Sequence, residues 1–114
     1  MSVVLVVEDE PLVRLPICES LASDGYVVLT ASDADEAIGI LESRNDINTV
    51  FTDIELPGSM DGLRLAAAVR DRWPPIKIVI TSGKRKPGVD QMPSNAQFIG
   101  KPYQTADVLR AFRV

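Results

Sequence analysis

The chain has 114 residues, of which 46% are hydrophobic and 25% charged, a composition typical of one ordinary globular domain. A net charge of -4, with no basic tract beyond Lys84-Arg85-Lys86, argues against direct binding to nucleic acid. A single cysteine, Cys18, excludes an internal disulfide, and no apolar run reaches the length of a membrane span, so we expect a cytoplasmic protein without membrane contact.

Five short apolar segments have the length and composition of β-strands. They are Val3 to Val7, Tyr26 to Leu29, Val50 to Phe51, Ile76 to Ile80 and Phe98 to Ile99. Their apolar residues are continuous rather than alternating, which favours strands that are buried on both faces, as in a parallel sheet.

Segments with helical periodicity alternate with these strands. The clearest helix follows Asp33, which with Glu36 forms a D-x-x-E variant of the capping box. Its apolar residues recur at i, i+3, i+4 and i+7, as Ala34, Ala37, Ile38 and Leu41. Similar spacings predict three more helices, marked by Val13, Ile17 and Leu21 before Gly25, by Leu65, Ala68 and Val69 before Pro74-Pro75, and by Val108, Leu109 and Phe112.

Proline placement modifies two of these expectations. Pro11 suits a first helical position, but Pro16 removes a backbone hydrogen bond about one turn later and should either kink the first helix or delay its start. Residues 84–97 contain Pro87 and Pro93 without any apolar periodicity, so we expect at most a short turn there.

The alternation of strands and helices predicts an α/β fold with a doubly wound, five-stranded parallel sheet covered by helices on both sides. Residues 1–114 contain no linker or internal repeat, so we expect a single domain. In such sheets ligands bind outside the carboxyl ends of the strands, where the strand order reverses.

Polar side chains follow four of the predicted strands. They are Glu8 and Asp9 after the first, Asp53 after the third, Thr81 and Ser82 after the fourth, and Lys101 after the fifth. Two carboxylates about 4 Å apart repel by roughly 4 kcal/mol at an effective dielectric constant near 20, so a cation must relieve the charge. The chain has no histidine, and an all-oxygen site favours a hard ion such as Mg2+, with Lys101 as a second positive charge and Thr81 as a hydroxyl donor.

The stretches VVEDEP, VFTD, ITSG and GKPY together resemble the response-regulator receiver domain of two-component signalling, which has the chemotaxis-regulator fold. The resemblance covers essentially the whole chain. It is specific because an acidic pair, a lone aspartate, a threonine and a Lys-Pro pair follow strands one, three, four and five in that order. It implies the flavodoxin-like strand order 2-1-3-4-5.

The resemblance also implies a role for each acid. Asp53 would accept a phosphoryl group from the phosphohistidine of a separate histidine kinase or histidine phosphotransfer protein, so the chain would be a phosphoacceptor rather than an enzyme. Mg2+ would bridge Asp9, Asp53 and a phosphoryl oxygen. Glu8 would hold the ion through water, and the backbone carbonyl of Glu55 would complete the shell. The downstream partner and the formation of a homodimer stay open.

The same resemblance implies a switch. Lys101 would pair with the phosphoryl group, and Thr81 would bind its remaining oxygen while an aromatic side chain on the fifth strand turns inward. Phe98 occupies that aromatic position and has no hydroxyl, so the switch would work by packing alone. The peptide bond between Lys101 and Pro102 would be cis. The segment at 84–97, where the family places its fourth helix, would be short or replaced by a loop.

Simpler explanations compete for single residues: Asp53 could cap a turn, Thr81 could be an ordinary strand residue, and Phe98 could belong to the core. Three other functions also fit parts of the sequence. They are a receiver fold that binds a partner without phosphorylation, a Mg2+-dependent phosphohydrolase suggested by the D-x-E stretch from Asp53 to Glu55, and a mononucleotide binder of the flavodoxin type. The acids in EDEP would repel a nucleotide phosphate, and the chain lacks the length for the cap region of a phosphohydrolase.

Two departures from the family pattern concern the loop after Asp53. The stretch LPGSMDG has one residue more than the common form, so the loop should be reshaped. Glu55 occupies a position that in the family influences how fast the acyl phosphate hydrolyses, and an acid there could either orient or exclude water.

Overall fold

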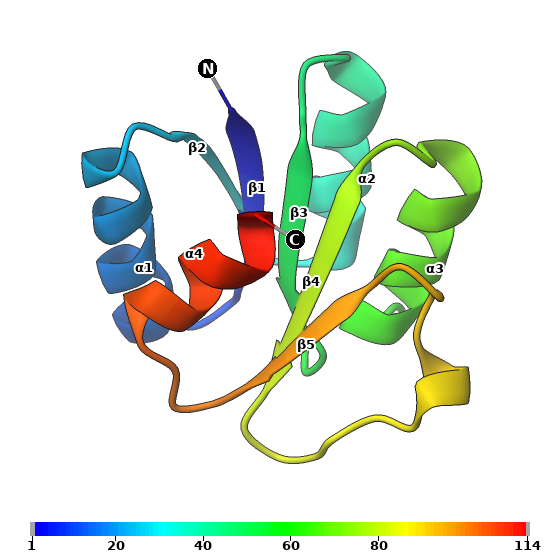
Figure 1. The fold of residues 1–114 in the computed structure, drawn as a ribbon. Coiled ribbons are helices and arrows are strands. Elements are labelled where there is room, and N and C mark those ends of the chain that lie inside the picture. The colour runs from blue at the N-terminus through cyan, green and yellow to red at the C-terminus, as the bar shows by residue number, and fades with distance from the viewer. Residues whose placement is uncertain (1, 114) are drawn as a thin grey trace.

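A five-stranded parallel sheet with helices on both faces forms the structure, a computed structural model that describes residues 2–113 (Figure 1). Its strands are β1 (Val3–Val7), β2 (Val27–Ala31), β3 (Thr49–Asp53), β4 (Lys77–Ser82) and β5 (Gln97–Gly100). Its α-helices are α1 (Pro11–Ser23), α2 (Ala34–Ser43), α3 (Gly62–Arg72) and α4 (Thr105–Arg113). The strand order is β2-β1-β3-β4-β5, which confirms the predicted fold.

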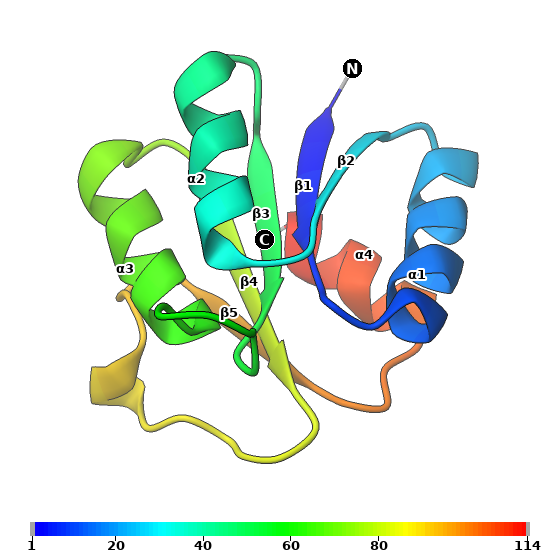
Figure 2. The same cartoon turned by 180° about the vertical axis from the view of Figure 1, so that it is seen from behind.

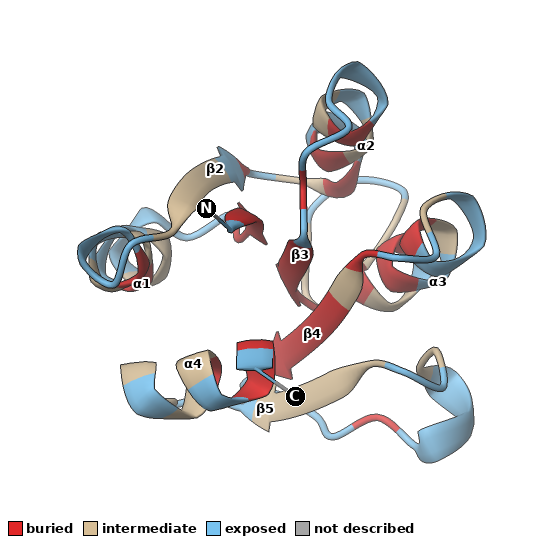
Figure 3. Ribbon diagram, turned by 45° about the horizontal axis from the view of Figure 1, so that its top comes forward, coloured by how far each residue is buried: buried red, intermediate tan, exposed pale blue. Residues whose placement is uncertain are grey.

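Each face of the sheet buries its own core, because successive side chains of a strand point to opposite faces. In β1, Val3, Leu5 and Val7 pack with residues of α2 and α3, whereas Val4 and Val6 pack with residues of α1 and α4. Figure 2 shows α2 and α3 together on one side of the sheet. The central strands β1, β3 and β4 are buried and the edge strands β2 and β5 are mostly half-buried (Figure 3).

The helix starts agree with the sequence in part. Helix α1 begins at Pro11, so Pro16 lies inside the helix and does not delay its start. Proline at this position leaves the carbonyl of Leu12 without its helical donor, and Leu12 is exposed, so water can satisfy that carbonyl.

Among residues 2–113, no helix combines the length and the apolar character needed to cross a membrane.

The predicted capping box of α2 forms only in part. The Asp33 carboxylate accepts the backbone N–H of Glu36 at 2.8 Å, as the pattern requires. The Glu36 carboxylate accepts the backbone N–H of Ser32 at 2.7 Å, one residue before the cap. Both bonds still satisfy donors at the helix entrance, so α2 is fixed on both sides of its first turn.

Strand ends differ from the prediction where polar residues join the ladder. β3 continues through Thr52 to Asp53, and β4 continues to Ser82, because these residues pair in register with their neighbours. Tyr26 precedes β2 instead of starting it, and its N–H bonds to the carbonyl of Leu21. Apolar content alone does not detect buried polar residues, so the strands predicted from it end before the observed ends of β3 and β4.

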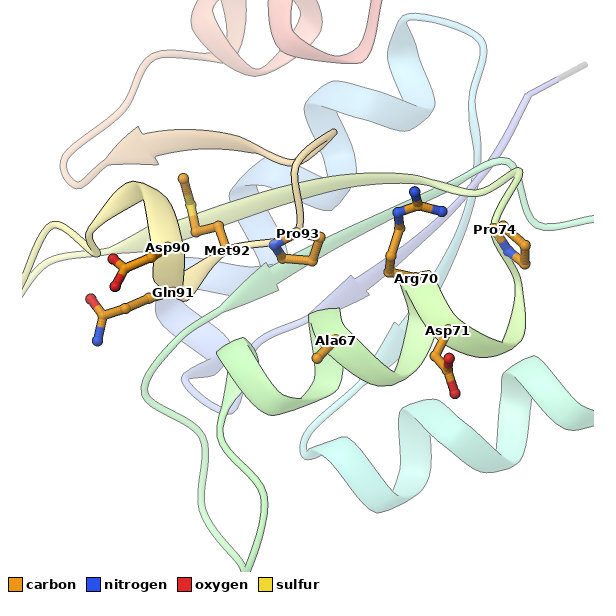
Figure 4. A pocket seen from close by; sticks show the side chains of 8 residues that line it. All are labelled: Ala67, Arg70, Asp71, Pro74, Asp90, Gln91, Met92 and Pro93. Atoms are coloured by element: carbon orange, nitrogen blue, oxygen red, sulfur yellow. The ribbon is translucent and has the colours of Figure 1, made fainter.

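Residues 84–96 contain no α-helix, as the sequence predicts, and form only a 3-10 turn at Val89–Gln91. This segment runs past α3 and leaves a pocket of about 600 Å³ between them. Figure 4 shows Arg70 and Asp71 of α3 on one side of this pocket and residues 90–93 on the other. The chain between β4 and β5 is therefore mostly irregular backbone.

The start of α3 lies directly against the end of β3. Asp61 caps the helix by accepting the backbone N–H of Arg64 at 2.9 Å, and the N–H of Gly62 donates to the carbonyl of Ile54 at 2.8 Å. A Cβ on Gly62 would stand 1.8 Å from the backbone oxygen of Asp53. Only glycine permits this approach, which fixes the backbone that carries Asp53.

We expect Gly62→Ala to lower the free energy of unfolding by at least about 2 kcal/mol, because the new methyl group must displace backbone. Gly39→Ala is the matched control, since no atom lies within 4 Å of a Cβ built there in the middle of α2. That change should stabilise the protein by roughly 0.5 to 1 kcal/mol. Urea denaturation measures both values, and equal effects of the two substitutions would contradict the close approach.

Candidate functional site

Charged side chains from three strands meet at the carboxyl edge of the sheet. The ammonium of Lys101, which follows β5, lies 2.8 Å from Glu8 Oε1 and 3.1 Å from Asp53 Oδ2. Glu8 and Asp53 are almost completely buried, with 4% and 3% of their surface exposed. The expected convergence of Glu8, Asp53 and Lys101 is therefore present, with one cation between two buried acids.

Two buried polar atoms at this edge have no hydrogen-bond partner among residues 2–113. They are Asp53 Oδ1 and Thr81 Oγ1. Asp53 and Thr81 are paired in register across β3 and β4, so the two residues are neighbours. Buried polar atoms are normally bonded, and leaving one unpaired costs about 1 to 3 kcal/mol. An acceptor and a hydroxyl side by side therefore fit a further polar group, such as a metal ion or a phosphoryl oxygen.

The burial of the site shifts its protonation equilibria. Burial raises the pKa of Asp53 to about 6, the hydrogen bond from Lys101 opposes this rise, and the charge of Glu8 adds to it. For Lys101, burial lowers the pKa, but the hydrogen bonds to Glu8 and Asp53 outweigh burial and hold the pKa above its ordinary value. Lys101 is thus charged at neutral pH, and its one charge does not fully offset two carboxylates.

Oxygen ligands for a metal ion line a pocket of about 310 Å³ over Asp53. The carboxylates of Glu8, Asp9 and Glu10 each place an oxygen within 4.8 Å of the others, and Asp9 and Glu10 line the pocket together with Asp53. The all-oxygen set and the unpartnered Asp53 Oδ1 fit Mg2+, which prefers such ligands. Glu10 was not among the predicted ligands, although it follows Asp9 directly in the sequence.

Of the other predicted site residues, Glu55 lies at this centre and Phe98 does not. Glu55 lines the pocket, and its carboxylate accepts the hydroxyl of Ser82 at 2.8 Å, a contact that the sequence did not reveal. Phe98 lies outside this pocket, half-buried on β5, and packs against the core formed with α2 and α3. The Lys101-Pro102 peptide bond is cis, as expected.

Comparison with known proteins shows the family of this chain. A family model described as the response regulator receiver domain matches residues 4–113. The chain belongs to this family. Over 106 residues it is 34% identical to the sensor kinase CckA of Brucella abortus, a match that covers 90% of this chain and 11% of that protein. The chain thus spans about a tenth of the length of this curated relative.

Solved receiver structures have the same fold. The response regulator receiver protein from Sinorhizobium medicae aligns with a TM-score of 0.91 and 26% identity, covering 98% of this chain and 91% of that chain. The response regulator protein TrrA from Thermotoga maritima, in complex with Mg2+-BeF, aligns with a TM-score of 0.84 and 26% identity, covering 99% and 97%. The chain is a receiver domain of two-component and phosphorelay signalling, a family whose members are generally phosphoacceptors rather than enzymes.

The raised pKa of Asp53 gives a pH dependence that can be measured without metal. Because the folded-state pKa of about 6 exceeds the ordinary 3.8, protonation of Asp53 stabilises the folded protein; this stabilisation is complete below pH 3.8 and is lost as the pH rises from 3.8 through about 6. Asn does not titrate, so the stability of Asp53→Asn relative to the native protein should rise across this pH window, by on the order of 3 kcal/mol. Urea denaturation in EDTA at several pH values measures the difference, and a difference that is constant with pH would contradict the shift.

Proposed function

We propose that Asp53 accepts a phosphoryl group from the phosphohistidine of a histidine kinase or histidine phosphotransfer protein, with Mg2+ bound beside it. The observation that carries this proposal is the buried Asp53 carboxylate, with one oxygen on Lys101 and the other without a partner among residues 2–113. The site lines a pocket large enough for a phosphoryl group. Residues 1–114 contain no histidine, so the donor histidine lies outside them.

The transfer requires little of the protein beyond position and charge. An oxygen of Asp53 forms a bond to phosphorus as the bond from phosphorus to the donor imidazole nitrogen breaks, and that nitrogen keeps the electron pair. At neutral pH, above its pKa of about 6, most of the Asp53 carboxyl is already ionised, so no base is needed to activate it. The ammonium of Lys101 is close enough to pair with the incoming phosphoryl oxygens.

Asp9 and Asp53 are the carboxylates that would hold the metal directly, with Glu8 acting through water and Glu55 through its backbone carbonyl. Bound Mg2+ would neutralise charge on the phosphoryl oxygens during transfer. Glu8 is engaged by Lys101 at 2.8 Å, which suits an indirect role for this acid. Asp9 is exposed at the pocket and free to turn toward an ion.

Thr81 and Phe98 would connect the phosphoryl group to the output surface. The Thr81 hydroxyl is buried and without a partner among the described residues, so it can donate to a phosphoryl oxygen. Any movement of Thr81 would shift the backbone of the segment after β4, which contains only the 3-10 turn at Val89–Gln91. Phe98, which has no hydroxyl, would respond through packing. Residues 1–114 would act as one cytoplasmic receiver domain, with the downstream partner and dimer formation left open.

Phosphorylation is tested directly with a small-molecule phosphodonor. Acetyl phosphate plus Mg2+ should add one phosphoryl group, seen by intact mass, and EDTA should prevent this. Asp53→Asn should abolish the mass gain, whereas Asp71→Asn, which removes an exposed carboxylate from α3, should not. Labelling that persists in Asp53→Asn would refute the assignment, and no labelling of the native protein would favour a receiver fold that only binds a partner.

The irregular output segment should exchange its amides fast. Across residues 84–96, where the structure has no α-helix, we expect exchange at least about tenfold faster than in β4 before phosphorylation. Phosphorylation at Asp53 with Mg2+ should slow exchange there by ordering the segment. Mass-spectrometric hydrogen exchange measures this, with Asp53→Asn treated identically as the control. Equal protection in both states would exclude this segment as the responsive surface.

A further inference from the structure

The Glu55 carboxylate is held by the end of β4. The hydroxyl oxygen of Ser82 lies 2.8 Å from one carboxylate oxygen and 2.9 Å from the other. Both oxygens therefore face Ser82, the last residue of β4, although Glu55 comes from the loop after β3. We call the contact of Glu55 with Ser82 and Arg85 the Glu55 clamp.

Ser82 is itself fixed, so its hydroxyl cannot turn away. It is 3% exposed, and its oxygen accepts the backbone N–H groups of Lys84 at 3.1 Å and Arg85 at 3.2 Å. A hydroxyl offers one hydrogen and two lone pairs. The two backbone bonds occupy both lone pairs, which leaves the hydrogen pointing at Glu55.

Arg85 adds a weaker contact to the clamp. Its Nε lies 3.9 Å from Glu55 Oε2, and its Nη2 lies 3.5 Å from Asp61 Oδ2. The Arg85 side chain is 48% exposed, so solvent screens both ion pairs and each contributes well under about 1 kcal/mol. The buried Ser82 hydroxyl is thus the main restraint on the Glu55 carboxylate.

Glu55 is a hydrogen-bond acceptor that lines the pocket over Asp53. The same pocket is lined by Gly83 and Lys84, which follow β4 directly. Gly83 has no side chain and the Lys84 ammonium can only donate, so of these three side chains only Glu55 can accept a hydrogen bond from water.

Hydrolysis of phosphorylated Asp53 needs a water in this pocket. The water oxygen forms a bond to phosphorus while the bond from phosphorus to Asp53 breaks, and the electron pair returns to the carboxylate. The water gives up its protons to solvent or to an acceptor beside it. A carboxylate free to accept from that water would orient it and speed the reaction.

We propose that Ser82 is a positioning residue that holds both oxygens of the Glu55 carboxylate toward the end of β4 and so keeps them from turning toward the hydrolytic water. Ser82 thereby lengthens the lifetime of the phosphoryl group on Asp53. The inference rests on the proposed function of Asp53 and gives the influence of Glu55 a direction. Glu55 speeds hydrolysis only when the clamp is open.

The half-life of the phosphorylated protein tests this directly. After labelling with acetyl phosphate and Mg2+ and removal of the donor, loss of the phosphoryl group is followed by intact mass. Ser82→Ala should shorten the half-life roughly fivefold, the change expected from one hydrogen bond. Ser94→Ala, at an exposed serine in the segment after β4, is the matched control and should keep the native half-life.

A second background separates positioning from mere support of the 82–85 turn. In Glu55→Ala, whatever its own half-life, adding Ser82→Ala should cause no further shortening, because the alanine side chain has no acceptor that could orient the water. If Ser82→Ala shortens the half-life equally in both backgrounds, or in neither, the inference is wrong. If every protein is labelled but the half-lives agree, the inference alone fails. If the native protein gains no mass, the proposed function is wrong, and the inference that depends on it is wrong as well.

Discussion

The contact on which the site depends is the single ammonium of Lys101 between two buried carboxylates. A buried carboxylate without a partner is strongly destabilising, and Glu8 and Asp53 both stand at the ends of central strands with almost no access to water. Lys101 bonds to both, at 2.8 and 3.1 Å. One positive charge against two negative charges leaves a deficit. Burial raises the pKa of Asp53 and the uncompensated charge of Glu8 adds to that rise, so the site favours a second cation.

The parallel sheet explains why these groups meet at all. In a parallel sheet every strand ends at the same edge, so residues as far apart as Glu8 and Lys101 come within hydrogen-bond distance. The backbone of Asp53 is fixed by its close contact with Gly62, because the start of α3 packs directly against the backbone oxygen of Asp53. The Asp53 carboxylate therefore sits on rigid backbone, which is what the proposed transfer by positioning would require.

The sequence predicted the fold and the charged centre for identifiable reasons. Continuous apolar strands alternating with helical periodicity determine a parallel α/β sheet, and the topology then brings Glu8, Asp53 and Lys101 together. It did not predict the bond between Ser82 and Glu55 or the need for Gly62 at its position. Those features depend on distances between backbone segments, and neither apolar periodicity nor residue type records a distance. At Pro16 the sequence does carry a local signal, the preference of proline against the interior of a helix, but the surrounding structure overrides that preference and α1 continues through Pro16.

The two sides of the site differ in stiffness. On the α3 side, the Asp61 cap and the Gly62 approach tie the loop after β3 to a regular helix. On the β4 side, the chain leaves Ser82 for a segment with only one 3-10 turn, which has few backbone hydrogen bonds of its own. Within residues 2–113, the Glu55 clamp connects these two sides. Glu55 belongs to the loop after β3, which is tied to α3, and Ser82 is the last residue of β4 before the irregular segment. Under the proposed function, a change at Asp53 would reach the irregular segment by two routes, through Thr81 within β4 and through Glu55 across the pocket. Because both routes end at adjacent residues, Thr81 and Ser82, the end of β4 is where the proposed chemistry of the site would be coupled to the shape of residues 84–96.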